Sequence, residues 1–450
     1  MLEHMATSTP SSTVGQSSKP WWVWFALALL WAAALYFGVI PWFRPRGFYL
    51  WGHYRIRDIC TGTFLGLTAL YATAVILMPT RYRRPFAFRC IVMFFTLLAM
   101  VFVTDLAYTL GVMRAWQADY WLDQAHISRR YSLPDRELGF VRRPGIAWQG
   151  RLPGNDQLIY YRTDEHGFRN RTGLGHAKLV FIGDSYTEAA QVAEPDTFVQ
   201  RVAVASGLSA VNLGRGAYGS QQEFIVLRRY GLAYQPRVVF WQFFEGNDLS
   251  DAYNFALWQQ TGGQSTKSLR SRLLENSLLN QLLSLTLLPR PITPMAKLRY
   301  TDQTEQALAP RYRYQPQPPQ QMAVGMEETL KAIETGFRLC QDKGIRLVLV
   351  FIPSMVRVME PWLTFDDAAQ RERYLPGNTV KAQGDFSSQL QQLCQQLGCP
   401  YLDAFPALRS QAARDNKRIY IPNDEHLDVM GHQVIAQLLL EWLRANPSSM

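Results

Sequence analysis

The sequence predicts an α/β protein with a doubly wound parallel sheet, preceded by an N-terminal region of three transmembrane helices. Two observations predict this class. Three apolar stretches, each near the roughly 20 residues needed to cross a bilayer, occupy the first quarter of the 450-residue chain. After residue 175, short apolar runs alternate with amphipathic helical patterns, which is typical of a parallel sheet between two helix layers.

The composition supports more than one module. Hydrophobic residues make up 48% of the chain and charged residues 18%, against about 25% charged in average soluble proteins, and the deficit is concentrated in the first quarter. The first four residues resemble a cloning scar before a native Met5. Residues 1–20 are rich in Ser and Thr and are expected to be a disordered N-terminus.

The predicted membrane spans are Trp21–Phe43, Asp58–Met78 and Cys90–Met113, within a transmembrane region of residues 21–113. The first span is too long for a cleavable signal peptide, and two more spans follow it. Asp105 lies inside the third span. It is either a functional intramembrane carboxylate or a group that sits near the interface or pairs with an arginine, and we favour the second interpretation.

The net charge of +10 comes largely from arginines beside the spans and suggests contact with anionic lipid headgroups. No basic helix has nucleic-acid motif features, so nucleic-acid binding is not expected. The arginines of loops 44–57 and 81–89 lie on opposite sides of the membrane, so charge alone does not decide the topology. The three cysteines after the spans, Cys340, Cys394 and Cys399, are expected to be buried free thiols.

The remaining chain divides into a connecting segment, 114–175, and an α/β domain, 176–450. The expected strands are 178–183, Ala210–Leu213, Arg237–Phe244, Ile345–Ile352 and Tyr401–Phe405. The expected helices are 195–206, 220–233, Met326–Lys343, 384–397 and 429–444. An insertion of about 253–325 contains a Leu-rich stretch and a Pro/Gln-rich stretch. It could be a lid, a substrate groove or a membrane-facing flap.

The segment Lys178-Leu-Val-Phe-Ile-Gly-Asp-Ser185 is the most informative part of this domain. An apolar run closed by a turn is typical of a central parallel strand. Its serine stands at the carboxyl end of the strand, where open α/β sheets bind ligands and where a nucleophile is exposed yet rigidly held. Three later segments add polar groups: Val211–Gln221 with three glycines, Val238–Asp248 ending in Gly-Asn-Asp, and Asn423-Asp-Glu-His-Leu-Asp428.

In order and spacing these segments resemble the four blocks of the SGNH (GDSL-type) hydrolase superfamily, over roughly residues 135–445. The blocks are Gly183-Asp184-Ser185, the glycine loop around Gly216, Gly246-Asn247-Asp248 and Asp424-Glu425-His426. The resemblance implies a flavodoxin-like three-layer fold, Ser185 as nucleophile and His426 as base. It also implies an oxyanion hole built from the Ser185 N–H, the N–H of Gly216 or Ala217, and the Asn247 side chain.

The chain departs from the superfamily at the acid. Many members place it three residues before the histidine, where this chain has Asn423. Asp424 gives an Asp-x-His spacing that is similar to the alginate O-acetyltransferase-like branch. We therefore assign Asp424 as the orienting acid, with Asp428 in reserve. His432 is expected to serve packing or capping, and His166, in a turn before the nucleophile, is a weak alternative base.

The resemblance implies a membrane-anchored serine acyl-transfer enzyme that acts on O-acyl groups of cell-surface polysaccharide or peptidoglycan, with acetyl the expected group. Water as acceptor makes it an esterase, and a sugar hydroxyl makes it an O-acetyltransferase. The alternatives are a lipid esterase or lysophospholipase, and a non-catalytic SGNH-fold assembly factor for polysaccharide export.

The expected partners are the lipid bilayer, the polymer substrate and a membrane-bound acyl donor. The expected location is the inner cell membrane, with a periplasmic catalytic domain. No cofactor is expected, and no metal, because the histidines and cysteines lack ligand spacing.

Overall fold

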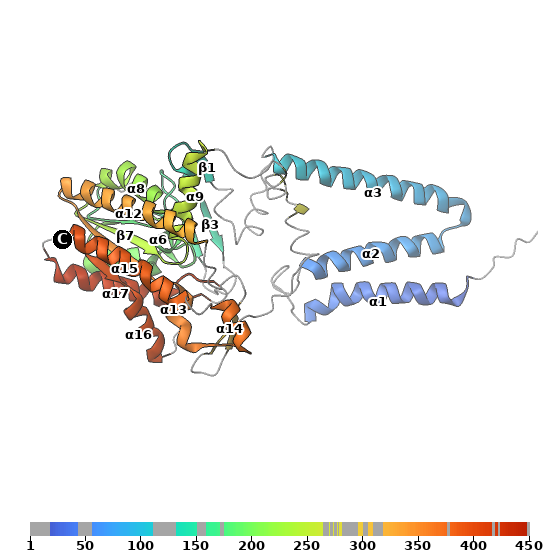
Figure 1. Cartoon of the computed structure of the whole chain (residues 1–450). Coiled ribbons are helices and arrows are strands. Elements are labelled where there is room, and N and C mark those ends of the chain that lie inside the picture. Colours follow the sequence, from blue (N-terminus) through green and yellow to red (C-terminus); the bar gives the residue numbers. More distant parts are fainter. Residues whose placement is uncertain are drawn as a thin grey trace, which may run out of the picture. The chain divides into compact units, whose positions relative to one another are not determined.

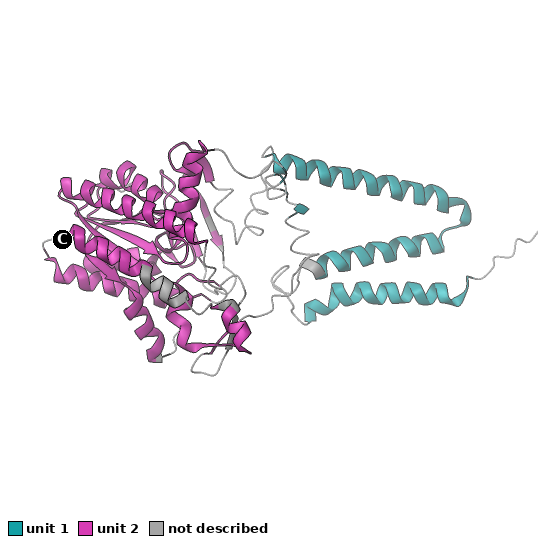
Figure 2. Ribbon diagram, viewed as in Figure 1, with its two compact units in different colours: residues 1–115, 269–290 teal, residues 116–268, 291–450 magenta. Residues whose placement is uncertain are grey.

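The computed structural model describes residues 19–43, 56–110, 132–150, 159–171, 175–263, 270, 273, 277, 279–280, 296–299, 305–308, 318–375, 379–415, 419–421 and 424–447. The chain forms two compact units (Figure 2). Unit 1 contains residues 1–115 and 269–290, and unit 2 contains residues 116–268 and 291–450. The first 18 residues, the arginines of the 44–55 stretch and Asn423 lie outside the described residues.

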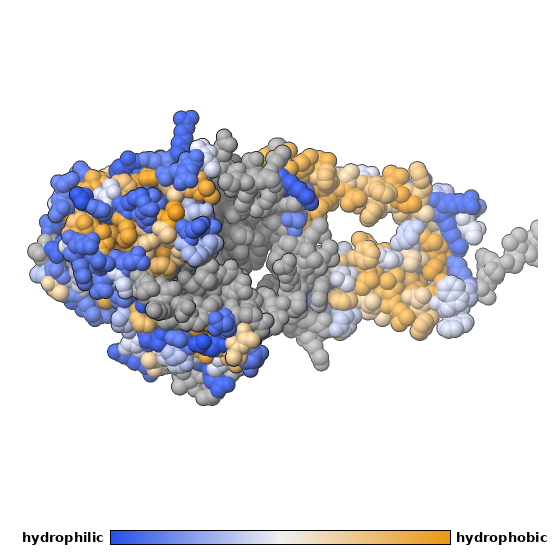
Figure 3. All heavy atoms as spheres, in the orientation of Figure 1, coloured by the Kyte–Doolittle hydropathy of each residue, from blue (hydrophilic) through white to orange (hydrophobic). Residues whose placement is uncertain are grey.

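Unit 1 is built on three helices, α1 (Trp21–Phe43), α2 (Ile56–Leu77) and α3 (Thr80–Thr109). All three are long and apolar enough to cross a membrane. Few of their side chains are buried, and the space-filling view shows a mostly hydrophobic surface along them (Figure 3). A helix that is apolar all round needs an apolar surrounding, so these helices match the three predicted spans. α3 begins ten residues before the predicted span, at Thr80.

Asp105 is bonded within unit 1. Its carboxylate accepts hydrogen bonds from the Ser277 hydroxyl and the Leu279 N–H, both at 2.8 Å. Among the described residues, a segment distant in the sequence supplies the donors to Asp105, and no arginine does. This segment belongs to the insertion predicted at 253–325, and it groups with the helices of unit 1. A place for Asp105 near the membrane interface stays a prediction.

Unit 2 contains a five-stranded, fully parallel sheet (Figure 1). Its strands are β5 (Leu179–Ile182), β6 (Ala210–Asn212), β7 (Val238–Phe244), β10 (Arg346–Ile352) and β12 (Tyr401–Asp403). They lie in the order β12-β10-β7-β5-β6. This is the 2-1-3-4-5 order of flavodoxin-like sheets, whose switch point falls between the first and third strands. Here that point is between β5 and β7.

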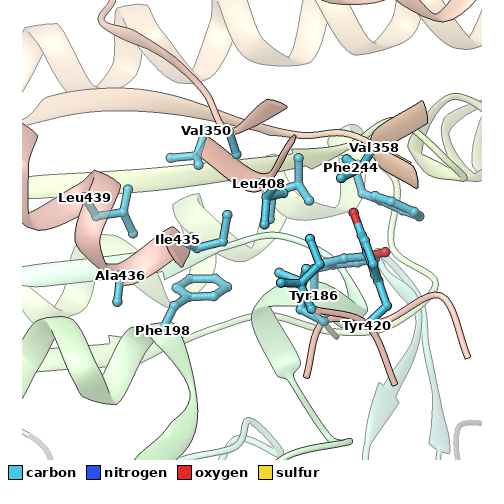
Figure 4. Close-up of a cluster of buried hydrophobic side chains, with 14 of the residues drawn as sticks. Tyr186, Phe198, Phe244, Val350, Val358, Leu408, Tyr420, Ile435, Ala436 and Leu439 are labelled. Atoms are coloured by element: carbon cyan, nitrogen blue, oxygen red, sulfur yellow. The ribbon is translucent and has the colours of Figure 1, made fainter. Parts of the chain in front are cut away.

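Alternate residues of β5 face two different cores, which explains the continuous apolar run. Leu179 and Phe181 pack with α7 (Phe198–Ser206), α16 (Phe405–Asp415) and α17 (Val429–Ala445). Figure 4 shows part of this core. Val180 and Ile182 pack with α8 (Ser220–Arg229), α12 (Pro319–Asp342) and α15 (Thr379–Leu397). The sheet therefore lies between two helix layers, as the sequence predicts.

Several elements differ from the prediction. The connecting segment is partly a β region of unit 2, with hairpins β1 (Ser132–Asp135)–β2 (Gly139–Arg142) and β3 (Ala147–Gly150)–β4 (Ile159–Arg162). The insertion begins with a helix, α9 (Asp248–Gln260). Short elements also fill the connections: η1 (Glu194–Asp196), η2 (Gly231–Tyr234), β8 (Ala296–Arg299), β9 (Glu305–Leu308), α13 (Met355–Met359), η4 (Glu360–Trp362), β11 (Leu363–Thr364) and α14 (Ala368–Tyr374). All five cysteines are free, and Cys340, Cys394 and Cys399 are buried, as predicted.

Candidate active site

Ser185 lies at the switch point of the sheet, directly after the turn that ends β5. It is the first residue of the four-residue helix α6 (Ser185–Glu188), and Asp184 caps this helix by accepting the Tyr186 N–H at 2.9 Å. At Gly183 a side chain would collide with Gln242 and Thr187, so the turn requires glycine. Asp184 is fully buried. The nucleophile candidate is thus half-exposed on a rigid support.

His426 reaches Ser185 from the far end of the chain. Its Nε2 lies 2.8 Å from Ser185 Oγ. The segment that carries it is held by a bridge between Tyr420 and Leu427 and by a 3.0 Å bond from the Ile421 N–H to the His426 carbonyl. The Tyr186 hydroxyl also donates to the Glu425 carbonyl at 2.6 Å. The 241 residues that separate His426 from Ser185 in sequence are therefore bridged by contacts of the His426 backbone and of its two neighbours, Glu425 and Leu427.

Asp424 lies on the other side of the same ring. Its Oδ1 is 2.5 Å from His426 Nδ1 and also accepts the His426 N–H at 2.9 Å. Burial lowers the pKa of His426, but the Asp424 carboxylate outweighs it and raises this pKa to about 9. Ser185, His426 and Asp424 form one hydrogen-bonded chain, the arrangement in which a histidine can take a serine proton.

The other candidate acids and bases lie elsewhere. Asp428, the reserve candidate for the orienting acid, instead caps α17 by accepting the Gly431 N–H at 2.9 Å. His432 is buried, and its Nδ1 accepts the Phe198 N–H at 3.3 Å. Burial lowers the pKa of His432 to about 3, so this ring is neutral. His166 packs against Tyr230, with ring centroids 5.2 Å apart.

The glycine loop approaches the nucleophile with the two expected backbone donors, the N–H groups of Gly216 and Ala217. The Gly216 N–H donates to Glu188 Oε2 at 2.7 Å, and an oxyanion role for Gly216 stays a prediction. The N–H groups of Ser185 and Ala217 have no acceptor among the described residues. Ala217 adopts a left-handed φ of 65°, a conformation that favours glycine over residues with a side chain.

Asn247 is engaged by a carboxylate. Its Nδ2 donates to Asp251 Oδ2 at 2.8 Å, one turn along α9. One amide proton is left for another acceptor. An oxyanion role for Asn247 stays a prediction. Glu245, two residues earlier, accepts the Ser354 N–H at 2.9 Å and pairs with Arg357 at 2.6 Å. It thereby ties the end of β7 to the chain just after β10.

Sequence reasoning missed a buried ionic network beside the nucleophile. Glu188 accepts hydrogen bonds from Arg142, the Tyr161 hydroxyl at 2.6 Å and Arg215 at 3.3 Å. Arg142 and Tyr161 come from the hairpins of the supposed connecting segment. The sequence signal that could have indicated this network is the position of Glu188, three residues after Ser185 and so within one helical turn of it.

A second missed feature is a group of buried carboxyls near β7. Asp248 Oδ2 accepts the Phe244 N–H and Glu223 Oε2 accepts the Trp241 indole N–H, both at 2.7 Å. Burial raises the pKa of both groups well above the usual range and that of Asp251 to about 7. Even so, no three His, Cys, Asp or Glu side chains of the described ranges are grouped so as to hold a metal ion.

Comparison with known proteins gives structural neighbours only. No family model and no curated protein matches the chain. A GDSL-like lipase from Bacteroides thetaiotaomicron is 10% identical, with 59% of this chain and 87% of that chain covered and a TM-score of 0.31. A catalytic mutant of an acetylxylan esterase from Geobacillus stearothermophilus is 11% identical, with 59% and 93% covered and a TM-score of 0.34.

A member of the lipolytic G-D-S-L family from Veillonella parvula is 10% identical, with 58% of this chain and 96% of that chain covered and a TM-score of 0.33. These are proteins to which the chain is similar. All three TM-scores are below 0.5.

Proposed function

We propose that this chain is a membrane-anchored serine acyl-transfer enzyme of the SGNH type, an esterase or an O-acetyltransferase. One observation carries the proposal. Ser185 Oγ, the His426 ring and the Asp424 carboxylate are joined by contacts of 2.8 and 2.5 Å. A weak hydroxyl nucleophile, a base within hydrogen-bond reach and an acid that orients the base are the parts that acyl transfer needs.

The reaction follows from this geometry. Ser185 Oγ attacks the acyl carbonyl carbon while His426 Nε2 takes the hydroxyl proton. Donors such as the N–H groups of Ser185 and Ala217 stabilise the oxyanion of the tetrahedral intermediate. The C–O bond to the leaving alcohol then breaks, and His426 returns the proton to that alcohol. Water or a sugar hydroxyl then attacks the acyl carbon of the Ser185 ester while His426 takes its proton. The bond between the acyl carbon and Ser185 Oγ breaks, and His426 returns the proton to Ser185 Oγ.

The membrane anchor supports a substrate class. Three apolar helices are long enough to hold the enzyme at a bilayer, which would keep it beside the polymers of the cell surface. We therefore propose O-acetyl groups of cell-surface polysaccharide or peptidoglycan as the substrate. The proposed location is the inner membrane with unit 2 on the periplasmic side, where a membrane-bound donor partner would supply the acyl group.

The decisive experiment uses the full-length protein in detergent and an aryl acetate. We expect turnover by the wild-type protein and loss of at least about three orders of magnitude in Ser185→Ala, with an unchanged melting temperature. Addition of oligosaccharide acceptors separates the two enzyme classes. Transfer of acetyl to the sugar indicates a transferase, and release of acetate alone indicates an esterase.

The same assay tests the alternatives. Faster cleavage of a lysophospholipid than of acetylated oligosaccharide would favour the lipid esterase. Equal rates in the wild-type protein and a folded Ser185→Ala variant would rule out the enzyme and leave the assembly factor. The 2.8 Å contact between His426 and Ser185 is the observation that argues against a non-catalytic role.

A further inference from the structure

The carboxylate of Glu188 is buried one helical turn after the nucleophile. Only 3% of the residue is exposed. It binds two guanidinium groups, Arg142 and Arg215, the Tyr161 hydroxyl and the Gly216 N–H. Burial raises the pKa of Glu188, but the two arginines outweigh it and lower this pKa to about 2. The group is therefore a permanent negative charge with four donors around it.

The Gly216 N–H belongs to a tight turn. The turn runs from Arg215 to Tyr218 and is closed by a 3.2 Å bond from the Tyr218 N–H to the Arg215 carbonyl. Ala217, its third residue, has φ 65°, as the third residue of a type II turn requires. The Arg215 N–H also donates to the Gly183 carbonyl at 2.9 Å. The turn is thus tied to the same strand end that carries the nucleophile.

The central peptide of this turn has a defined direction. Its carbonyl, Gly216 O, accepts a hydrogen bond from Arg215 Nη1 at 3.3 Å. In a trans peptide the C=O and the N–H point in opposite directions. The Ala217 N–H therefore points away from the guanidinium, and no described residue accepts it.

The turn also lies against the nucleophile. A β-carbon built on Gly216 would be 3.4 Å from Ser185 Cβ and 3.2 Å from Glu188 Oε2. A side chain at this position would crowd Glu188 and just touch the serine. The space between the loop and the serine is thus no wider than one added methyl group would fill, which places the backbone donors of the loop beside the nucleophile, where an oxyanion donor is needed.

We propose that Glu188 and Arg215 are positioning residues that aim the Ala217 N–H at the oxyanion, an inference that rests on the proposed function. Glu188 holds the peptide before Gly216, and Arg215 holds the peptide after it. Since Glu188 and Ser185 share α6, the nucleophile and the anchor of its oxyanion donor move together. Neither side chain touches the substrate in this arrangement.

Residues of the two hairpins, and Arg169 after them, hold the rest of the Glu188 carboxylate and the end of α6. Arg142 from β2 and the Tyr161 hydroxyl from β4 hold the remaining side of Glu188. Arg169, which follows β4, binds the backbone where α6 ends, at the carbonyls of Glu188, Ala189 and Val192. Arg142, Tyr161 and Arg169, from the segment before the parallel sheet, therefore support the anchor of the turn.

The test measures kcat and KM for an aryl acetate in the full-length protein. Glu188→Gln keeps the shape but removes the charge, and Arg215→Lys keeps the charge but removes the planar fork. We expect kcat to fall about 10- to 100-fold in each, part of the loss seen when an oxyanion donor is removed. KM should stay within about twofold, and the pH midpoint set by His426 should not move.

Glu194→Gln is the matched control. Glu194 also pairs with two arginines, Arg162 at 3.3 Å and Arg171 at 3.4 Å, but it makes no recorded contact with the turn. Its kcat should equal that of the wild-type protein. Burst titration with a slow acyl substrate counts intact sites, so a fall in kcat per titrated site cannot come from unfolded protein.

Removing a buried charge can prevent folding, so a third variant keeps the inference testable. An ester in place of the amide at Ala217 removes this N–H and leaves both ion pairs intact, and it should lower kcat as Glu188→Gln does. Unchanged kcat per site in Arg215→Lys or in the ester variant would overturn the inference. If instead the wild-type protein and Ser185→Ala react equally, the proposed function itself has failed.

Discussion

His426 is the residue at which the electrostatics of the site can be measured. Burial would lower its pKa, and the Asp424 carboxylate at 2.5 Å raises it to about 9. A general base must be neutral. The rate constant kcat/KM for an aryl acetate should therefore rise about tenfold per pH unit and level off near pH 9. A rate that is already constant from pH 6 upward would contradict this assignment.

Asp424→Asn tests the source of that shift. Loss of the carboxylate removes what raises the His426 pKa, so the midpoint of the pH profile should move to lower pH. The plateau rate should fall by about 10⁴, as the amide replacement does in a serine protease whose base loses its orienting acid. Asn423→Ala is the natural comparison and should retain most of the rate. Equal losses in both variants would mean that the local backbone, and not the carboxylate, matters.

At the scale of elements, the Asp428 carboxylate, close to His426 in sequence, stabilises the start of α17 and not the imidazole. Asp428 accepts the Gly431 N–H at 2.9 Å and begins the helix that packs Ile435 and Leu439 against β5 and β7. Asp428→Ala should lower the free energy of unfolding by about 1 kcal/mol, the usual value of an N-cap. Chemical denaturation measures this. Turnover at 25 °C should stay near that of the wild-type protein, whereas a loss as large as that of Asp424→Asn would make Asp428 the orienting acid.

The strands of the parallel sheet and the helices that cover it were predictable because each depends on its own apolar pattern. The run Leu179–Ile182 is buried on both faces wherever it lies in a parallel sheet, and its turn residues mark its end. Ser185 was found at the end of such a run, and His426 and Asp424 were assigned from the resemblance of their segment to a superfamily block. The Glu188 network was not predicted, since its partners Arg142, from a hairpin, and Arg215, from the glycine loop, meet only in the folded chain. No local pattern encodes that meeting.

At the scale of the whole chain, the arginines flanking the spans leave the orientation of unit 2 unresolved, and the proposed substrate requires it to be outside. We predict that the loop at 44–57 and unit 2 lie on the same, periplasmic side. Single cysteines introduced at 50 and at an exposed site of unit 2, such as Gln259, should react with an impermeant maleimide in intact spheroplasts. A cysteine introduced at Thr80, the first residue of α3, should react only after lysis. Protection of the unit 2 cysteine would exclude extracellular polymers as substrates.

The division of the chain into units has a practical consequence. Residues 269–290 belong with the helices, while the chain on either side of them belongs to unit 2. The polypeptide therefore passes between the units at three places, near residues 115, 268 and 290. A water-soluble form made only by deleting the N-terminal helices would keep Ser277 and Leu279 but lose Asp105, their acceptor. A soluble catalytic unit calls for a second excision, with residues 269–290 replaced by a short hydrophilic linker.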